Sequence, residues 1–324
     1  MSRSPLLCVS GLEIAIRVGP SPLAAVNGIT LSLDAGECAC LVGESGCGKS
    51  LTALSLLGLL PSPPFCVNGS ITFQGRNLLD LTERGWRSIR GREIAMIFQE
   101  PMTALNPVFT VGAQIGEAIT THEKVPSREV KGRVETLLVQ VGISDPEIRL
   151  GQYPHELSGG LRQRVMIAMA LACGPRILLA DEPTTAIDVS IQAQILDLLH
   201  ALRAERGLGL LLITHNLGVV ARIADRVLIM YAGRIVEEAP VRDLFAQPLH
   251  PYTRGLLASL PPASGRKHGR LTPIPGAVPS LGEIPGGCAF HPRCPQAVAA
   301  CSHIIPSQTS PAPGRKVACH LYPA

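Results

Sequence analysis

The segment Gly43–Ser50, which reads GESGCGKS, constrains the fold of this chain more than any other feature. It fits the pattern G-x-x-x-x-G-K-[ST] and lies between an apolar run, Cys38–Val42, that predicts a strand and a run over 49–60 that predicts a helix. Glycines let the backbone curl so that successive N–H groups point at phosphate oxygens, and the start of the helix adds its positive dipole end. We therefore expect a nucleotide phosphate site, with the Lys49 ammonium on the phosphates and the Ser50 hydroxyl on Mg²⁺.

An apolar run that ends in two carboxylates follows in the second half of the chain, where Ile177–Ala180 precedes Asp181 and Glu182. Ligands of open α/β sheets bind beyond the carboxyl ends of the strands. We expect Asp181 to hold Mg²⁺, directly or through water, and Glu182 to polarise the attacking water. Adjacent acids can also be a plain solvated strand end, but the phosphate loop upstream favours the functional interpretation.

The remaining pattern alternates strands with helices. Strands are expected over 6–18, 29–33, 94–98 and 210–214, helices over 161–172 and 190–206, and a hairpin over 226–238. This alternation is typical of an α/β fold with a mainly parallel sheet. After residue 247 prolines and glycines become frequent and the periodicity fades, so we place a domain boundary there.

Bulk composition excludes several classes of protein. Of 324 residues, 46% are hydrophobic and 17% are charged, which allows a sizeable core. The net charge of +4, without a concentrated basic patch, argues against a nucleic-acid partner. The longest charge-free run, over 51–75, is broken by prolines and is too short in apolar residues to span a bilayer, and the N-terminus does not resemble a signal peptide. We expect a cytosolic protein that reaches the membrane only through partner subunits.

The string Leu157–Arg164, LSGGLRQR, resembles the signature motif of ABC ATPases, in the form found in peptide importers. Other elements of that family occur in order. Gln99 matches the Q-loop glutamine after the strand over 94–98, Thr185–Asp188 matches the D-loop, and His215 matches the switch histidine after the strand over 210–214. The resemblance covers roughly residues 5–247.

This resemblance implies a P-loop NTPase fold of the ABC cassette type over 1–247, with a helical subdomain at about 101–165. Two such cassettes would pair head to tail around ATP, with Glu182 as general base, His215 as sensor of the γ-phosphate and Gln99 touching Mg²⁺ or water. The implied Mg²⁺ ligands are Ser50, Gln99 and Asp181. The implied ATP contacts of the phosphate loop are Gly43, Ser45, Gly46, Cys47, Gly48, Lys49, Ser50 and Leu51. Those implied for the partner-cassette side are Ser158, Gly159, Gly160, Gln163 and Asp188.

The region 248–324 resembles the C-terminal extension of oligopeptide and dipeptide importer ATPases. The resemblance rests on the segment Gln247–Thr253, QPLHPYT, and on a C-x5-C-x6-C-x17-C pattern formed by Cys288, Cys294, Cys301 and Cys319. In some members this small, irregular region holds a [4Fe–4S] cluster, and four thiolates suit that cofactor. Zinc, or cysteines that are unligated or in a disulfide, are the alternatives.

The implied function is that of the ATPase subunit of an importer for di- and oligopeptides, peripheral to the cytoplasmic face of the inner membrane. Its implied partners are a second ABC ATPase subunit, two transmembrane permease subunits and an extracytoplasmic solute-binding protein. The second ATPase subunit is either a related paralogue, which the resemblance favours, or a second copy of this chain. Nickel or another small solute is the alternative cargo. A soluble ABC ATPase of repair or translation is disfavoured, because only about 110 residues without a heptad run separate Lys49 from Ser158, and the chain has one cassette.

Overall fold

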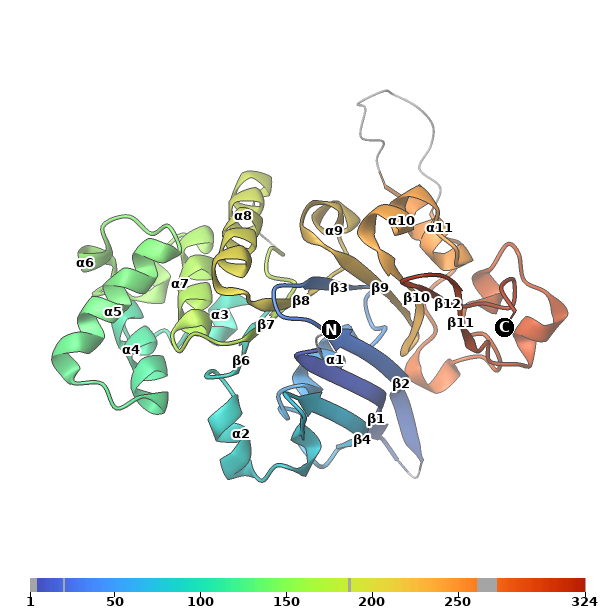
Figure 1. The fold of residues 1–324 in the computed structure, drawn as a ribbon, viewed down its shortest axis with the longest axis horizontal. Helices are drawn as coiled ribbons and strands as arrows, with labels where there is room; N and C mark the ends of the chain where they lie inside the picture. Colours follow the sequence, from blue (N-terminus) through green and yellow to red (C-terminus); the bar gives the residue numbers. More distant parts are fainter. Residues whose placement is uncertain (1–4, 20, 186–187, 261–272, 324) are drawn as a thin grey trace. The chain divides into compact units, whose positions relative to one another are not determined.

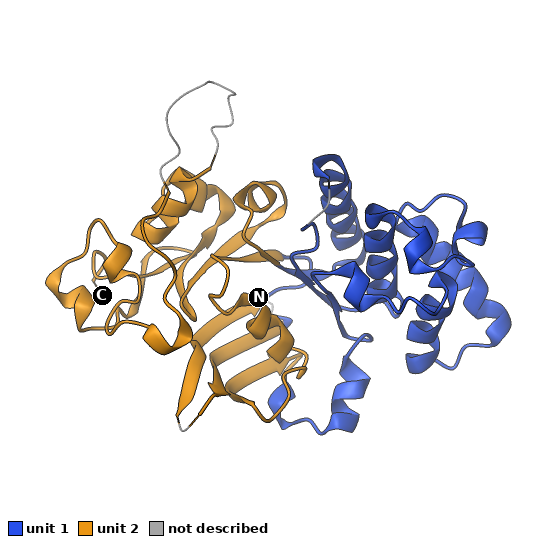
Figure 2. Ribbon diagram, turned by 180° about the vertical axis from the view of Figure 1, so that it is seen from behind, with its two compact units in different colours: residues 1–6, 33–37, 78–212 blue, residues 7–32, 38–77, 213–324 orange. Residues whose placement is uncertain are grey.

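The computed structural model describes residues 5–19, 21–185, 188–260 and 273–323. The chain forms two compact units, which Figure 2 distinguishes by colour. Unit 1 comprises residues 1–6, 33–37 and 78–212, and unit 2 comprises residues 7–32, 38–77 and 213–324. The chain therefore enters each unit more than once.

Unit 1 is mainly helical and contains a parallel strand pair, β6–β7, in which Ile94 lies opposite Ile177 and Ile97 opposite Ala180 (Figure 1). Helix α7 contacts α3, α4, α5 and β6. The described helices and strands of unit 1 are η1 (Leu78–Asp80), α2 (Glu83–Ile89), β6 (Ile94–Ile97), α3 (Pro101–Ala104), α4 (Val111–His122), α5 (Ser127–Gln140), α6 (Pro146–Arg149), η2 (Pro154–Glu156), α7 (Gly159–Leu171), β7 (Ile177–Asp181) and α8 (Val189–Arg206). Strand β8 (Gly209–Thr214) carries the chain from unit 1 into unit 2.

Local sequence explains these elements. All five residues of β7 are buried, as expected for an apolar run without alternation. The Thr110 hydroxyl caps α4 by accepting a hydrogen bond from the Ala113 N–H at 3.3 Å, and α8 ends at Gly207, whose φ of 62° is left-handed. None of the described helices is both long enough and apolar enough to cross a membrane.

Unit 2 contains a four-stranded sheet in the order β2-β1-β4-β5 and a run of five neighbouring strands in the order β11-β12-β10-β9-β3. Strand β3 pairs with β9 in parallel, whereas β9–β10, β10–β12 and β11–β12 are antiparallel. The described elements of unit 2 are β1 (Leu7–Arg17), β2 (Pro22–Leu33), β3 (Cys38–Val42), α1 (Lys49–Ser55), β4 (Phe65–Phe73), β5 (Arg76–Asn77), α9 (Leu217–Ile223), β9 (Arg226–Tyr231), β10 (Arg234–Pro240), α10 (Val241–Ala246), α11 (Pro251–Ala258), η3 (Leu281–Glu283), η4 (His291–Arg293), η5 (Ala299–Ser302), β11 (Gln308–Ala312) and β12 (Arg315–Ala318).

The parallel pairs β6–β7 and β3–β9 confirm the predicted α/β class. Two boundaries differ from the sequence prediction. Helix α1 ends at Ser55 rather than Leu60, because tighter turns follow and Gly58 adopts a left-handed φ of 59°. Strand β2 begins at Pro22, seven residues before the apolar run that predicted it.

The C-terminal extension is more regular than the sequence predicted. Its strand β12 pairs with β10, so that Glu237 lies opposite Val317 and Glu238 opposite Lys316. The extension strands β11 and β12 contain few apolar residues, so the hydrophobic pattern of the sequence did not predict them. Their structure depends on the pairing of β12 with β10. The extension belongs to unit 2 together with the strands that precede it, and the division at residue 247 stays a prediction.

Candidate functional site

The predicted phosphate loop connects β3 to α1 in unit 2, and its backbone requires glycine at several positions. Gly46 and Gly48 have φ of 82° and 104°, which L side chains rarely adopt. A Cβ on Gly48 would lie 2.9 Å from the Ala25 carbonyl oxygen, and one on Gly43 would lie 2.2 Å from that of Met230. The loop therefore lies in close contact with neighbouring backbone, and a larger residue at Gly43 or Gly48 would displace it.

Lys49 lies at the first position of α1 and is 6% exposed. Its ammonium donates hydrogen bonds to the carbonyl oxygens of Gly43 at 2.8 Å and Glu44 at 2.9 Å. The loop thus curls around a buried positive charge, and an anion is the natural partner for such a group.

The other loop positions differ in what their side chains can offer. Ser45 and Ser50 are exposed, and Leu51 is partly buried. The Cys47 thiol is buried, with its sulfur 3.7 Å from the Lys49 nitrogen, and burial raises its pKa although Lys49 opposes the shift. Cys47 can therefore serve a ligand through its backbone, while its thiol stays protonated.

In unit 1, β7 ends at Asp181, which is 5% exposed, and Glu182 follows with a left-handed φ of 46°. The Glu182 carboxylate accepts hydrogen bonds from the Thr185 hydroxyl at 2.8 Å and from the Gln99 amide at 3.4 Å. Gln99 and Glu182 come together because they follow the paired strands β6 and β7. A non-glycine residue held in the left-handed region costs free energy and is typical of functional sites.

The predicted signature loop begins α7. The Ser158 hydroxyl caps this helix by accepting a hydrogen bond from the Leu161 N–H at 3.4 Å, and Ser158 and Gly159 are both exposed. Gly160 lies against α8, because a Cβ there would be 2.8 Å from the Ile191 side chain. The loop can therefore present a hydroxyl and backbone N–H groups at the surface.

Gln163 does not share that surface. It is 1% exposed and lies on the buried face of α7, where its amide nitrogen has no hydrogen-bond partner among the described residues. The nucleotide contact of Gln163 on the partner-cassette side stays a prediction.

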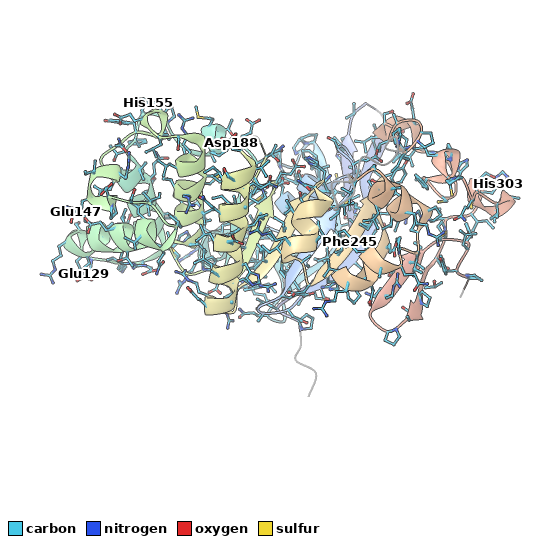
Figure 3. The ribbon with its side chains drawn as sticks, turned by 90° about the horizontal axis from the view of Figure 1, so that it is seen from above. Glu129, Glu147, His155, Asp188, Phe245 and His303 are labelled. Carbon is cyan, nitrogen blue, oxygen red and sulfur yellow. The ribbon has the colours of Figure 1, made fainter. Side chains whose placement is uncertain are left out.

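Two further predicted residues lie at the ends of elements. Asp188 is exposed at the start of α8 (Figure 3), while Ala186 and Ile187 of the predicted D-loop lie outside the described residues. His215 is exposed directly after β8, before α9, in unit 2. Unit 2 thus holds the phosphate loop and His215, and unit 1 holds Gln99, the two acids and the signature loop.

The predicted [4Fe–4S] cluster of the four extension cysteines is not supported by the described residues. The pKa of Cys288 is raised to about 11, mainly by burial and to a smaller extent by the nearby Cys301, Cys319 and Cys294. The four thiols are therefore neighbours in the extension. The described residues contain no group of three or more His, Cys, Asp or Glu side chains placed to hold a metal ion, zinc included. None of the ten cysteines, all of which the structure describes, forms a disulfide.

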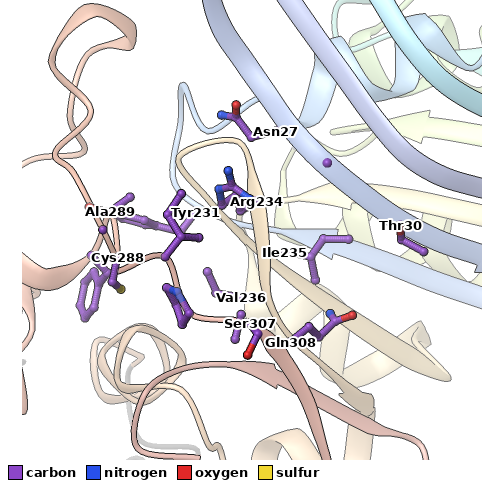
Figure 4. Close-up of a pocket in the computed structure, with 16 residues that line it drawn as sticks. Asn27, Thr30, Tyr231, Arg234, Ile235, Val236, Cys288, Ala289, Ser307 and Gln308 are labelled. Carbon is purple, nitrogen blue, oxygen red and sulfur yellow. The ribbon is translucent and has the colours of Figure 1, made fainter. Parts of the chain in front are cut away.

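A cavity of about 270 Å³ lies between β2, β10 and the extension. Its lining includes Asn27, Arg234, Cys288 and Gln308 (Figure 4). None of the predicted nucleotide contacts lines it. We therefore assign it no part in nucleotide binding.

Two contacts on the phosphate loop were not predicted from the sequence. The Tyr252 hydroxyl accepts a hydrogen bond from the Glu44 N–H at 3.0 Å, and the Arg293 guanidinium pairs with the Glu44 carboxylate at 2.8 Å. These residues are 208 and 249 positions from Glu44, and no local pattern marks them.

Comparison with known proteins gives two family matches. Residues 26–185 match the family described as ABC transporter, and residues 236–301 match the oligopeptide/dipeptide transporter C-terminal region. A putative peptide import ATP-binding protein of Brucella ovis is 51% identical, over 96% of this chain and 95% of that protein. The oligopeptide transport ATP-binding protein AppD of Bacillus subtilis is 48% identical, over 98% of this chain and 97% of AppD.

Solved structures agree with this match. The dimeric ATP-binding cassette MJ0796, in a post-hydrolysis state with ADP and Pi, has a TM-score of 0.65 and 26% identity, over 73% of this chain and 99% of that one. The cbiO1 protein of Clostridium perfringens, part of an ABC transporter complex, has a TM-score of 0.65 and 27% identity, over 76% and 92% of the two chains. The chain therefore belongs to the ABC transporter family, as an ATPase of the P-loop cassette fold that carries the oligopeptide/dipeptide transporter C-terminal region.

Proposed function

We propose that this chain hydrolyses ATP to power the import of di- and oligopeptides through partner membrane subunits. The observation that carries the ATP assignment is the buried Lys49 ammonium, enclosed by the carbonyls of a glycine loop. The peptide assignment is supported by the match of residues 236–301 and by relatives named for peptide import.

The division of roles follows the chemistry of each residue. Lys49 and the loop N–H groups bind the phosphates. The Ser50 hydroxyl, the Gln99 amide oxygen and the Asp181 carboxylate are oxygen donors of the kind Mg²⁺ prefers, and the ion would neutralise charge on the phosphates. Glu182 orients and polarises the attacking water, and His215 contacts the γ-phosphate. Ser158, Gly159, Gly160 and Asp188 face the nucleotide of a partner cassette.

The partners follow from the same proposal. The dimeric structures of MJ0796 support pairing of two cassettes, here with a related second ATPase subunit. Two transmembrane permease subunits provide the pathway, and an extracytoplasmic solute-binding protein delivers the peptide. This places the chain at the cytoplasmic face of the inner membrane, as a peripheral subunit.

Uptake of a labelled dipeptide tests the function directly. Cells that lack the gene are complemented with the normal chain or with Lys49→Ala, which removes the phosphate-binding charge. We expect uptake only with the normal chain. A matched exposed substitution, Lys131→Ala in α5, serves as the control and should restore uptake.

Dipeptide uptake that does not depend on the gene would overturn the peptide assignment. Labelled Ni²⁺ is measured in the same strains, because a gene-dependent uptake of nickel alone would identify the alternative cargo. Uptake restored equally by Lys49→Ala would overturn the role of the phosphate loop.

A further inference from the structure

The Arg293 guanidinium of the extension is fully engaged with the phosphate loop and its surroundings. Its side chain is 6% exposed and meets the Glu44 carboxylate through two hydrogen bonds, from Nη1 to Oε2 at 2.8 Å and from Nη2 to Oε1 at 3.1 Å. Its remaining donors reach the Tyr231 hydroxyl at 3.4 Å, the Pro275 carbonyl at 2.8 Å and the Gly276 carbonyl at 3.4 Å. All five N–H donors of Arg293 therefore have acceptors, a pattern that lysine cannot reproduce.

Glu44 is held at three points. Its carboxylate binds Arg293, its N–H donates to the Tyr252 hydroxyl at 3.0 Å, and its carbonyl accepts from Lys49 at 2.9 Å. The N–H of this loop residue is thus directed at the extension side of the loop. Glu44 links the extension to the lysine that the phosphate site depends on.

The groups that hold Glu44 are themselves fixed. Tyr231, Tyr252 and Phe290 are fully buried and pack edge to face or tilted, with ring centroids 4.7 Å apart for the two tyrosines and 5.3 Å from each tyrosine to Phe290. The Arg293 guanidinium lies over the Tyr231 and Phe290 rings, at 5.8 and 6.0 Å from their centroids. The hydrogen bonds to Glu44 raise the pKa of Arg293, so its charge is permanent.

The charge balance gives this arrangement a consequence for the ligand. A carboxylate in a loop that binds phosphates repels the ligand unless a cation neutralises it. Arg293, which belongs to the extension, supplies that cation.

We propose that Arg293 is a positioning residue of the phosphate loop, which with Tyr252 fixes Glu44 and cancels its charge so that the loop binds ATP tightly. This inference rests on the ATP site proposed above. It gives the C-terminal extension a part in nucleotide affinity.

The test is the Kd for Mg-ATP of the full chain, measured for Arg293→Gln, Glu44→Gln and the double variant. We expect Arg293→Gln to raise Kd on the order of tenfold, equivalent to about 1.4 kcal/mol, because Glu44 is left unneutralised. Removing the Glu44 charge as well should bring Kd back to within about threefold of the normal chain. High salt should reduce the effect of Arg293→Gln, since it screens the carboxylate.

Arg254→Gln is the matched control. Arg254 also lies in the extension and bonds to the Pro248 carbonyl, Gln296 and Tyr322, but it has no hydrogen bond to the loop. It should leave Kd unchanged. Thermal unfolding of every variant shows whether the fold is retained.

The following outcomes overturn the inference. If the double variant binds Mg-ATP as weakly as Arg293→Gln alone, Arg293 contributes through packing and not by cancelling the charge of Glu44. If Arg293→Gln does not fold, the Kd of Glu44→Gln tests the inference. A tenfold loss of ATP affinity in Glu44→Gln, in which Arg293 is intact, would contradict charge cancellation. Lys49→Ala tests the ATP site separately from the role of Arg293. Normal ATP binding by Lys49→Ala would overturn the proposed ATP site. Loss of ATP binding by Lys49→Ala, together with an unchanged Kd for Arg293→Gln, would overturn only the role of Arg293.

Discussion

The Thr185 hydroxyl donates a 2.8 Å hydrogen bond to Oε2 of Glu182, the same oxygen that the Gln99 amide approaches at 3.4 Å. Both donors meet one oxygen, so the carboxylate is held in one orientation after the left-handed turn of the Glu182 backbone. An oriented carboxylate is what a general base for water requires.

Replacing Glu182 by Gln should lower ATP hydrolysis by about 10²- to 10⁴-fold while ATP binding persists, because the amide keeps the shape but cannot accept a proton. Phosphate release and equilibrium ATP binding measure the two effects. Glu147→Gln, an exposed acid of α6 in the same unit (Figure 3), is the control and should hydrolyse normally. Undiminished phosphate release from Glu182→Gln would exclude Glu182 as the base.

The Ser158→Ala variant should distinguish the role of the Ser158 hydroxyl as a helix cap from its role in ATP hydrolysis. Loss of the cap on α7 should cost about 1 kcal/mol of unfolding free energy, measured by urea. Thr110→Ala removes an equivalent cap from α4, where the hydroxyl accepts from the Ala113 N–H at 3.3 Å, and should cost a similar amount. Only Ser158→Ala should also reduce hydrolysis in the assembled transporter. Equal ATPase activity of the two variants would make Ser158 a helix cap alone.

Gly48→Ala should damage the phosphate loop more than Gly46→Ala. Both glycines have left-handed φ, so each alanine costs about 1 kcal/mol in backbone strain. A Cβ on Gly48 would additionally lie 2.8 Å from Met230 and 2.9 Å from the Ala25 carbonyl, whereas one on Gly46 meets nothing within 4 Å. Thermal unfolding and ATP binding are measured for both. Equal losses would mean that the loop tolerates the extra atom.

His250 should make stability depend on acid pH. It is 1% exposed, its Nδ1 accepts the Tyr252 N–H at 3.0 Å, and burial lowers its pKa from 6.5 to about 3. The folded state therefore keeps His250 neutral, while the unfolded state takes up a proton below pH 6.5. The stabilisation is complete above pH 6.5 and is lost as the pH falls toward 3, by about 1.4 kcal/mol per pH unit.

Between pH 6.5 and 5 this group should account for about 2 kcal/mol of lost unfolding free energy, measured by urea denaturation. His250→Asn, which keeps an acceptor for the Tyr252 N–H, should show a shallower pH dependence. His155→Asn, an exposed histidine of unit 1, should leave the slope unchanged. An identical slope for His250→Asn would show that His250 is accessible to protons in the folded state.

The sequence was sufficient for the parts of the site that depend on local geometry. The loop after β3, the acids at the end of β7 and the cap of α7 each occupy one turn, and short patterns describe such turns completely. The approach of Gln99 to Glu182 was also predictable, since residues that follow neighbouring parallel strands meet at one edge.

Other features depend on side-chain direction or on distant contacts. The signature string does not indicate that the Gln163 side chain is buried on α7. The spacing of the four cysteines predicted a metal cluster, but the described residues contain no group of three or more His, Cys, Asp or Glu side chains placed to hold a metal ion. The contacts of Tyr252 and Arg293 with Glu44 join residues more than 200 positions apart, which no periodicity encodes.

The pairing of β12 with β10 also determines what a shortened chain would expose. Glu237 of β10 is fully buried, and its carboxylate accepts the N–H groups of Leu249 and His250 and pairs with Arg315. A chain cut after residue 247 loses all three partners and uncovers the unpaired backbone of β10. Such bare sheet margins recruit strands from other molecules and aggregate. We therefore expect β12, by pairing with β10, to keep this sheet edge from associating with another molecule.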